Sequence, residues 1–371
     1  MGLTWAKARG WRLQRQMLDP VGSGSVEDVV ARLGAVPAWP DMAAELVIGA
    51  RRQHGHYGDA ARALAAGNLV KVFAFRGATH LMAPRDAGAY LAVRASSRMW
   101  ELPSWESYYG LAPSDWPGFR EFVRQALDDG PLTRSELAGA LGRSRRYRHL
   151  RAAVTEGNDT LLKPLTWQGD MGLGPVRDGE TTFVRLDAVR GWAGIPDLDE
   201  AGPTVVAAYL RTYGPAPPDR LYDWFCKGLG AKRQALTRWL DHLDDQCEVV
   251  AVADDRVLVL RDDLDALRSA SASSAVRLLP GRDPWVMAPG TSDQRVVPAA
   301  RREGVSRSAN LVTAGGVVAG TWTLRGAQLD IAWFTESGRV PRTALEQATS
   351  DLSEFVGQPI EVAVRLDPPQ P

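Results

Sequence analysis

The sequence predicts an α+β fold that consists of three tandem winged-helix units and a small C-terminal β-barrel. Two observations indicate this fold. Helical segments are followed by a short β-hairpin pattern three times, and each hairpin begins about ninety residues after its predecessor, which is the size of a small domain. After the third hairpin the chain reads mainly as β-strands with one helical segment among them, as in a small barrel or curled sheet.

The length of the chain also indicates several parts. At 371 residues it is too long for one ordinary domain, and the serine-rich run 269–274 reads as a linker before the β-rich end. The predicted parts are winged helix 1 with an N-terminal helix (1–110), winged helix 2 (111–196), winged helix 3 (197–268) and a β-barrel-like domain (269–371).

The first repeat is the least regular of the three. Four apolar residues at helical spacing define its first helix, namely Val26, Val29, Val30 and Leu33. Two further helices are expected at 43–51 and 60–66, and the β-rich runs 69–75 and 79–82 form the expected hairpin.

The middle repeat is the clearest. Its first helix follows from apolar residues at helical spacing, which are Phe119, Phe122, Val123, Ala126 and Leu127. Gly130-Pro131 ends this helix, and Thr133-Arg134-Ser135-Glu136 is a capping box that opens the second one. A third helix over about 145–156 and a hairpin from 161–165 to 181–186 complete the winged-helix plan.

The third repeat copies this plan. Its expected elements are helices at 205–213, 218–225 and 231–243 and a hairpin of 248–252 and 257–260. The expected elements of the β-rich end are strands at 317–322, 329–333 and 360–366 and a helix at 342–355.

Charge and composition narrow the class of protein. The formal net charge is zero, which argues against a protein that coats nucleic acid indiscriminately. Of the 44 basic residues only five are lysine, so 39 are arginine, whose planar fork suits phosphates and base edges; genomic codon bias is the alternative explanation. No apolar run reaches the roughly 18 residues that span a bilayer, and no signal peptide is evident, so we expect a cytoplasmic protein outside the membrane.

Two basic clusters are candidates for contacting DNA. The arginine cluster consists of Arg143, Arg145, Arg146, Arg148 and Arg151, and it falls at the start of the middle repeat's third helix. That helix meets DNA in a helix-turn-helix, although a solvated basic face is the commoner explanation of a charge run. The second cluster consists of Arg51, Arg52, His54 and His56, which suit phosphate contacts or are plain surface residues.

Metal sites and the common enzyme motifs are missing from the sequence. His54 and His56 supply only two metal ligands, and the two cysteines, Cys226 and Cys247, form no CxxC pair, so no metal is expected. There is no P-loop, no HExxH and no nucleophile elbow. Because lysine is scarce, a lyase that needs an activated amine is not expected either.

Several segments resemble the AlkZ-like family of winged-helix DNA glycosylases. They are Leu3-Thr4-Trp5 with 12–16, Arg76-Gly77-Ala78-Thr79-His80-Leu81, the run 162–169 and the run 277–284. The resemblance implies three winged helices in a C-shape, then a β-barrel, with double-stranded DNA in the concave surface and no cofactor. It also implies excision of bulky N7- or N3-alkylated purines, unhooking of interstrand crosslinks in some members, and resistance to DNA-alkylating compounds. Lys163, Gln168 and Arg282 lie in these shared segments, and we expect them to contact DNA.

The catalytic motif of that family is altered here. The family carries Gln-x-Gln, or a variant such as Gln-x-Asp, just before a helix that begins Ala-Ala-Glu-Leu, and this sequence has Pro37-Ala38-Trp39 before its Ala43-Ala44-Glu45-Leu46. Proline and indole do not position water as an amide does. Asp41 is therefore either a substitute base or the N-cap of the helix, and Trp39 either stacks on a base or lies in a core. His80 is the next candidate for the chemistry.

Alternatives from other classes remain open at the level of the sequence. Within the family, the protein is an active enzyme that uses Asp41, a divergent enzyme with another substrate, or an inactive binder. Outside it, a winged-helix transcriptional regulator would dimerise on a palindromic site, whereas three fused units favour a monomer. A ligand-binding or drug-sequestering sensor is a third class, for which the 13 tryptophans give weak support.

Overall fold

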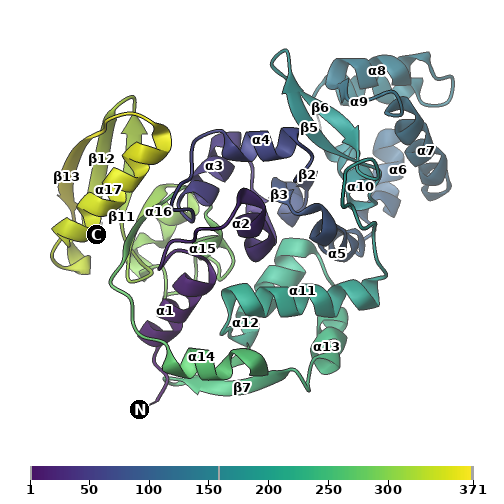
Figure 1. Ribbon diagram of the computed structural model, residues 1–371. Coiled ribbons are helices and arrows are strands. Elements are labelled where there is room, and N and C mark those ends of the chain that lie inside the picture. The colour runs from purple at the N-terminus through teal and green to yellow at the C-terminus, as the bar shows by residue number, and fades with distance from the viewer. Residues whose placement is uncertain (1, 158, 369–371) are drawn as a thin grey trace. The chain divides into compact units, whose positions relative to one another are not determined.

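The computed structural model describes residues 2–157 and 159–368 and shows a mixed α+β protein (Figure 1). Contacts divide the chain into two compact units. The first unit comprises Met1–Ala60, Val206–Trp224 and Leu240–Pro371, and the second comprises Ala61–Val205 and Phe225–Trp239. Each unit contains pieces of more than one of the four predicted parts, so those boundaries stay predictions. No helix of the described residues has the length and apolar character needed to cross a membrane.

The first unit contains the N-terminal helices and the β-rich end of the chain. Its elements are α1 (Trp5–Arg15), α2 (Val26–Leu33), β1 (Val36–Pro37), α3 (Asp41–Gly49), α12 (Pro218–Tyr222), β7 (Cys247–Val252), β8 (Asp255–Leu260), α14 (Leu264–Ser269), β9 (Val276–Leu279), α15 (Pro284–Met287), α16 (Arg302–Ser306), β10 (Asn310–Ala314), β11 (Val317–Arg325), β12 (Gln328–Phe334), α17 (Arg342–Val356) and β13 (Glu361–Asp367). Helical segments that continue from one unit into the other are α4 (Asp59–Ala65), α11 (Leu198–Tyr213), a π-helical turn (Asp223–Leu229) and α13 (Arg233–His242).

The four-residue apolar pattern of α2 is confirmed. Its apolar residues are all buried, and Ser25 with Asp28 forms a capping box at its start. The third hairpin is confirmed as well, because β7 pairs with β8 in antiparallel fashion. A backbone bridge joins Ala216, between α11 and α12, to Leu258 of β8.

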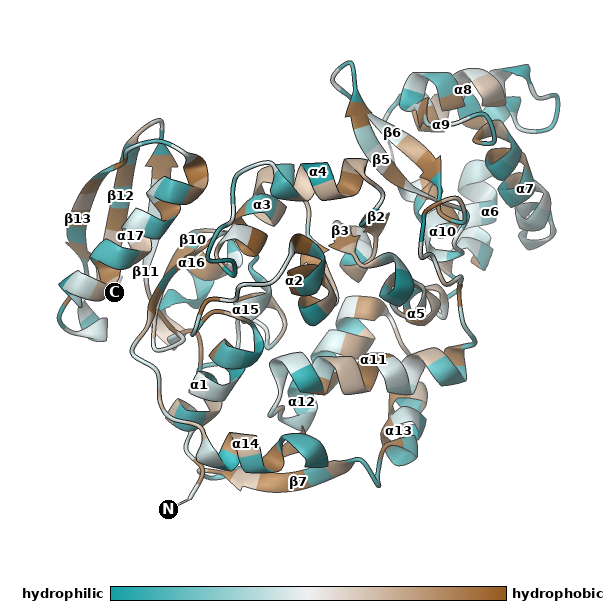
Figure 2. Ribbon diagram, viewed as in Figure 1, coloured by the Kyte–Doolittle hydropathy of each residue, from teal (hydrophilic) through white to brown (hydrophobic). Residues whose placement is uncertain are grey.

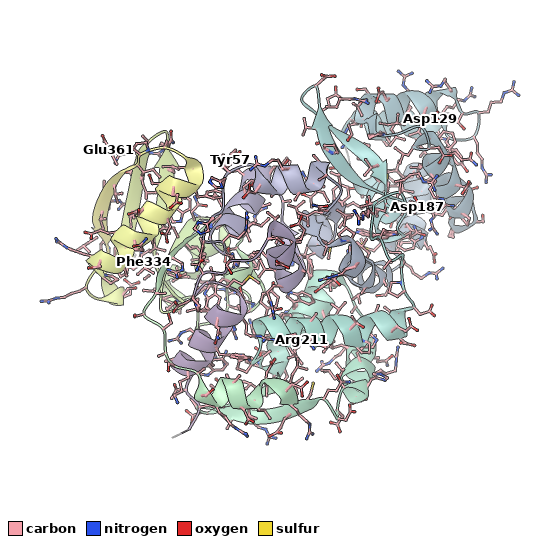
Figure 3. The ribbon with its side chains drawn as sticks, in the orientation of Figure 1. Tyr57, Asp129, Asp187, Arg211, Phe334 and Glu361 are labelled. Atoms are coloured by element: carbon pink, nitrogen blue, oxygen red, sulfur yellow. The ribbon has the colours of Figure 1, made fainter. Side chains whose placement is uncertain are left out.

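The C-terminal sheet is open rather than closed into a barrel. Its order is β13-β12-β11-β10-β9, and among the described residues β9 pairs only with β10 and β13 only with β12. The predicted barrel does not form, because the edge strands β13 and β9 do not pair with each other within the described residues. The strand β13 runs parallel to β12, and α17 is the crossover that a parallel pair needs. Figure 3 labels Phe334 at the end of β12 and Glu361 at the start of β13.

The helix α17 covers one face of this sheet. Leu345, Leu352 and Phe355 of α17 join Trp322 and Ile331 of the strands in one buried cluster. Figure 2 shows that β11 and β12 are largely apolar. The interior that a barrel would enclose is therefore replaced by a helix-on-sheet core.

The second unit contains the first two hairpins and the helices between them. Its elements are β2 (Val70–Phe73), β3 (Thr79–Met82), α5 (Pro84–Ala95), α6 (Pro103–Tyr109), α7 (Trp116–Ala126), β4 (Leu132–Thr133), α8 (Arg134–Arg143), a 3-10 turn (Arg148–Leu150), α9 (Arg151–Thr155), α10 (Lys163–Trp167), β5 (Met171–Arg177) and β6 (Glu180–Arg185). Its strands hydrogen-bond in the order β3-β2-β5-β6-β4. The predicted capping box of Thr133 and Glu136 opens α8, and the predicted first hairpin is β2 and β3.

Two elements of the middle repeat differ from the prediction. The run 161–165 is not a strand: it leads into α10, where Pro164 occupies the first turn that suits proline, and the hairpin is β5 with β6. The predicted third helix is shorter than 145–156. The chain leaves α8 at Ser144 in an extended conformation, and the Ser144 hydroxyl accepts the N–H of Tyr147, so helical turns resume only at Arg148.

Candidate functional site

The segment before α3 carries the altered catalytic motif. Pro37 ends the short strand β1 and Ala38 is buried, whereas the Trp39 side chain is 67% exposed. Pro40 occupies the N-cap position of α3 and makes no side-chain capping bond. Asp41 is the first residue of the helix, so the alternative that Asp41 is the N-cap is wrong. A carboxylate in the first turn is still stabilised by the helix dipole. The Asp41 side chain is exposed.

Exposed apolar side chains accompany this carboxylate. Met42 is 54% exposed and follows Asp41 directly, so Trp39 and Met42 present two large apolar groups at the start of α3. The prediction left Trp39 between a core and a stacking role, and its exposure excludes the core. Sequence reasoning missed Met42, although its place beside the motif position was a usable signal.

Contacts at the other end of α3 fix the helix in the first unit. A Cβ on Gly49 would lie 2.3 Å from the Phe355 ring of α17, so only glycine allows this approach. Within α3, the buried Glu45 carboxylate accepts the N–H groups of Gly58 and Ala60, each at 3.1 Å, and so holds the start of α4. The motif segment therefore rests on a helix anchored along its length.

Arg51 is a structural residue and not a DNA contact. Its guanidinium donates to both carboxylate oxygens of Asp283 at 2.8 and 2.7 Å, and both side chains are completely buried. It also donates to the Val47 carbonyl. The prediction failed because a charge run was expected to face solvent, whereas the Arg51 side chain points to Asp283 at the start of α15. Asp283 was missed, although an Asp directly before Pro284 is a helix-start signal.

The other residues of the second basic cluster differ in their surroundings. Arg52 is engaged by Asp59 at 2.5 Å and by the Gly24 carbonyl at 3.2 Å, which leaves it half-buried. His54 and His56 are exposed. Across the described part of the chain, no three His, Cys, Asp or Glu side chains gather as a metal site.

The arginine cluster of the second unit is exposed, as the sequence predicts. Arg146 alone of the five has an ion-pair partner among the described residues: it donates to Asp115 at 2.7 Å and thereby holds the pKa of that carboxyl below its usual range. The other four, Arg143, Arg145, Arg148 and Arg151, are solvent-exposed. On the opposite side Tyr147 and Leu150 are buried. Four of the five arginines thus present positive charge that no ion pair within the described residues neutralises.

Three residues from the segments that resemble the family, Lys163, Gln168 and Arg282, have different surroundings. Lys163 is half-buried at the start of α10, with Nζ 5.6 Å from the Phe73 ring centroid. Gln168 donates to the Pro164 carbonyl. Arg282 is exposed in the first unit and donates to the Ser308 hydroxyl at 2.8 Å. None of these contacts tests a role in DNA binding, which stays a prediction.

His80 lies in β3 and is almost fully buried. Desolvation lowers the pKa of its imidazole to about 4, so the ring is neutral near pH 7. Its Nδ1 lies 2.9 Å from the Ala78 carbonyl, which makes Nδ1–H the donor and leaves the lone pair on Nε2. The ring packs on Phe75 with centroids 5.3 Å apart. His80 and Lys163 thus contact residues of one hairpin.

Three kinds of comparison with known proteins agree on one family. A family model described as DNA glycosylase AlkZ-like matches residues 30–355. An interstrand DNA cross-link repair glycosylase of Streptomyces sahachiroi is 32% identical over 363 residues, which cover 96% of this chain and 98% of that protein. The solved structure of the Streptomyces sahachiroi DNA glycosylase AlkZ has a TM-score of 0.92 at 31% identity and covers 98% of this chain and 100% of that one.

Proposed function

The chain belongs to the DNA glycosylase AlkZ-like family, and from that membership we propose that it binds double-stranded DNA and acts on alkylated or cross-linked bases. The observation that carries the proposal is the likeness, over nearly the whole of both chains, to a cross-link repair glycosylase. The exposed arginine cluster supplies charge of the kind that phosphates require.

We propose further that the helix–hairpin segments are winged helices. In the second unit the order is α7, β4, α8, α9 and the β5–β6 hairpin, and β4 pairs with β6 as the first strand of a wing does. In the third repeat, Ala216 makes the corresponding bridge to the β7–β8 hairpin. The first repeat is proposed as a winged helix from the β2–β3 hairpin and the helices before it.

The reaction in question is hydrolysis of the N-glycosidic bond. In an N7-alkylated purine the base is already cationic, so it leaves with the bond's electron pair and becomes neutral. A water molecule then bonds to the anomeric carbon of the sugar and gives up a proton. The enzyme's task is to hold that water and to stabilise positive charge on the sugar.

In this chain Asp41 is the group proposed to take the water's proton. It is an exposed carboxylate, two residues past Trp39. Trp39 and Met42 would meet the bases around the lesion, where an indole stacks and a thioether fills space. With neither motif position carrying an amide, lesion binding with slow excision fits the residues better than rapid excision.

Release of base from defined substrates tests the proposal. Duplexes that carry N7-methylguanine, a bulkier N7-alkylguanine or an interstrand crosslink are incubated with the protein, and free base is quantified by chromatography. Tight binding of the lesion duplex, with or without base release, supports the proposal. Equal affinity for lesion and undamaged duplexes together with no released base would refute it.

The setting of the activity is proposed on the same basis. We propose a monomer that acts on DNA in the cytoplasm and protects its cell from DNA-alkylating compounds. A molar mass of one chain in light scattering, and increased survival of an expressing host exposed to an alkylating agent, are the expected results.

A further inference from the structure

A hollow on the second unit lies beside the arginine cluster and is separate from the altered motif. Its volume is about 400 Å³, which falls in the usual range of small-ligand pockets. The end of α6 forms one wall with Tyr108 and Tyr109. The 3-10 turn and α9 form the other, with His149, Leu150 and Ala153, and Glu156 completes the lining.

Tyr108 is held in place yet exposed. Its side chain is 71% exposed, the largest fraction among the exposed large apolar residues of the described chain. The ring meets that of Tyr109 edge-on, with centroids 4.7 Å apart, and the buried Tyr109 packs on Trp105 at 5.3 Å. An exposed aromatic ring that also contacts a buried aromatic neighbour is suited to stacking with a flat ligand.

Polar groups around the hollow match a nucleotide. Arg148 directly precedes the lining residues His149 and Leu150, is exposed and has no ion-pair partner among the described residues. Its guanidinium suits a phosphate. The Glu156 carboxylate accepts hydrogen bonds only, as exocyclic amino groups of adenine, cytosine and guanine require. His149 adds a second flat ring to the wall.

We propose that this hollow binds one unpaired nucleotide of DNA, with its base on Tyr108 and its phosphate on Arg148. The base must be unpaired because a base inside a duplex is stacked on both faces and offers no face to Tyr108. A damaged pair opens at low cost and supplies such a nucleotide. The inference rests on the proposed function and deepens it. The surface around the arginine cluster would bind an unpaired nucleotide at an opened base pair as well as the phosphate backbone of the duplex.

Three fluorescent DNAs test the site with the full-length chain. They are a short paired duplex, the same duplex with one bulged adenine, and the same duplex with an abasic residue in the bulge. The adenine bulge should bind at least about fivefold more tightly than the abasic one, because stacking on an aromatic side chain contributes at least that factor. Tyr108→Ala should remove this preference and Tyr108→Phe should keep it. Tyr57→Ala, at a 52% exposed tyrosine outside the hollow (labelled in Figure 3), should also keep it.

A spectroscopic measurement and the fold control complete the test. With 2-aminopurine in the bulge, the wild type should quench its fluorescence and Tyr108→Ala should not, while all three variants keep the wild-type melting curve. A wild type that binds both bulges equally, or a preference that survives Tyr108→Ala, overturns the site while leaving the proposed function standing. If the wild type binds none of the three DNAs, both the nucleotide site and the proposed function are refuted.

Discussion

Replacing Arg145, Arg148 and Arg151 with alanine should weaken DNA binding in a way that depends on salt. All three side chains are exposed, and none has an ion-pair partner within the described chain. Arg146 is left unchanged because Asp115 already holds its charge. If the three arginines contact phosphates, each releases counterions on binding.

The size of the effect follows from counterion release. Each neutralised phosphate contributes about 0.9 to the slope of log affinity against log salt, so three lost contacts reduce the slope by about 2.7. Between about 50 and 200 mM salt, the wild type should lose roughly 40-fold more affinity than the variant. The variant should therefore be much weaker at low salt and closer to the wild type at high salt.

Fluorescence anisotropy with an undamaged duplex, over a series of salt concentrations, measures this slope. Replacement of the same three residues with lysine is the matched control: lysine keeps the charge, so the slope should stay near that of the wild type. An alanine variant that melts like the wild type and has an unchanged slope would show that the cluster contacts no phosphate.

Three further results are expected. Asp41→Asn should abolish whatever base release chromatography detects from N7-methylguanine duplex and leave the affinity unchanged; unaltered release would place the chemistry elsewhere. Asp283→Asn should lower stability in urea by about 3–5 kcal/mol, because it leaves the Arg51 charge unpaired in the interior, and Arg51→Met on that background should restore part of the loss. The pKa of His80 is about 4 in the folded protein and about 6.5 in an exposed histidine. The neutral ring's contribution to the free energy of unfolding is therefore fully present above pH 6.5 and is lost as the pH falls toward 4. The urea midpoint should fall through that window by the equivalent of about 3 kcal/mol, and His80→Gln should flatten the fall.

Sequence periodicity predicted the elements whose stability is local. The helix α2 and the hairpin β7–β8 carry their own capping or alternation signals, and both stand where the pattern put them. The shortened helix after α8 has a local cause too, the Ser144 turn, but serine within an otherwise helical pattern gives little warning of it.

The remaining differences depend on contacts between distant parts of the chain. Strand alternation in the sequence does not tell whether the edge strands β9 and β13 pair with each other, and it does not reveal that α17 packs on the sheet and leads into a parallel β13. Arg51 and Arg145 look alike in sequence, yet one is buried against Asp283 and the other is solvated. Charge alone could therefore identify a basic surface but not its members.

The Arg51–Asp283 ion pair also constrains the order of events during protein synthesis. The two residues are 232 positions apart. At about 5–20 residues per second, the ribosome adds Asp283 some 10–50 s after Arg51. The nascent first unit cannot complete its interior during that interval, whereas Ala61–Val205 of the second unit is already synthesised. The helices α1 to α3 must therefore wait, exposed to chaperones and proteases, for the last third of the polypeptide to emerge.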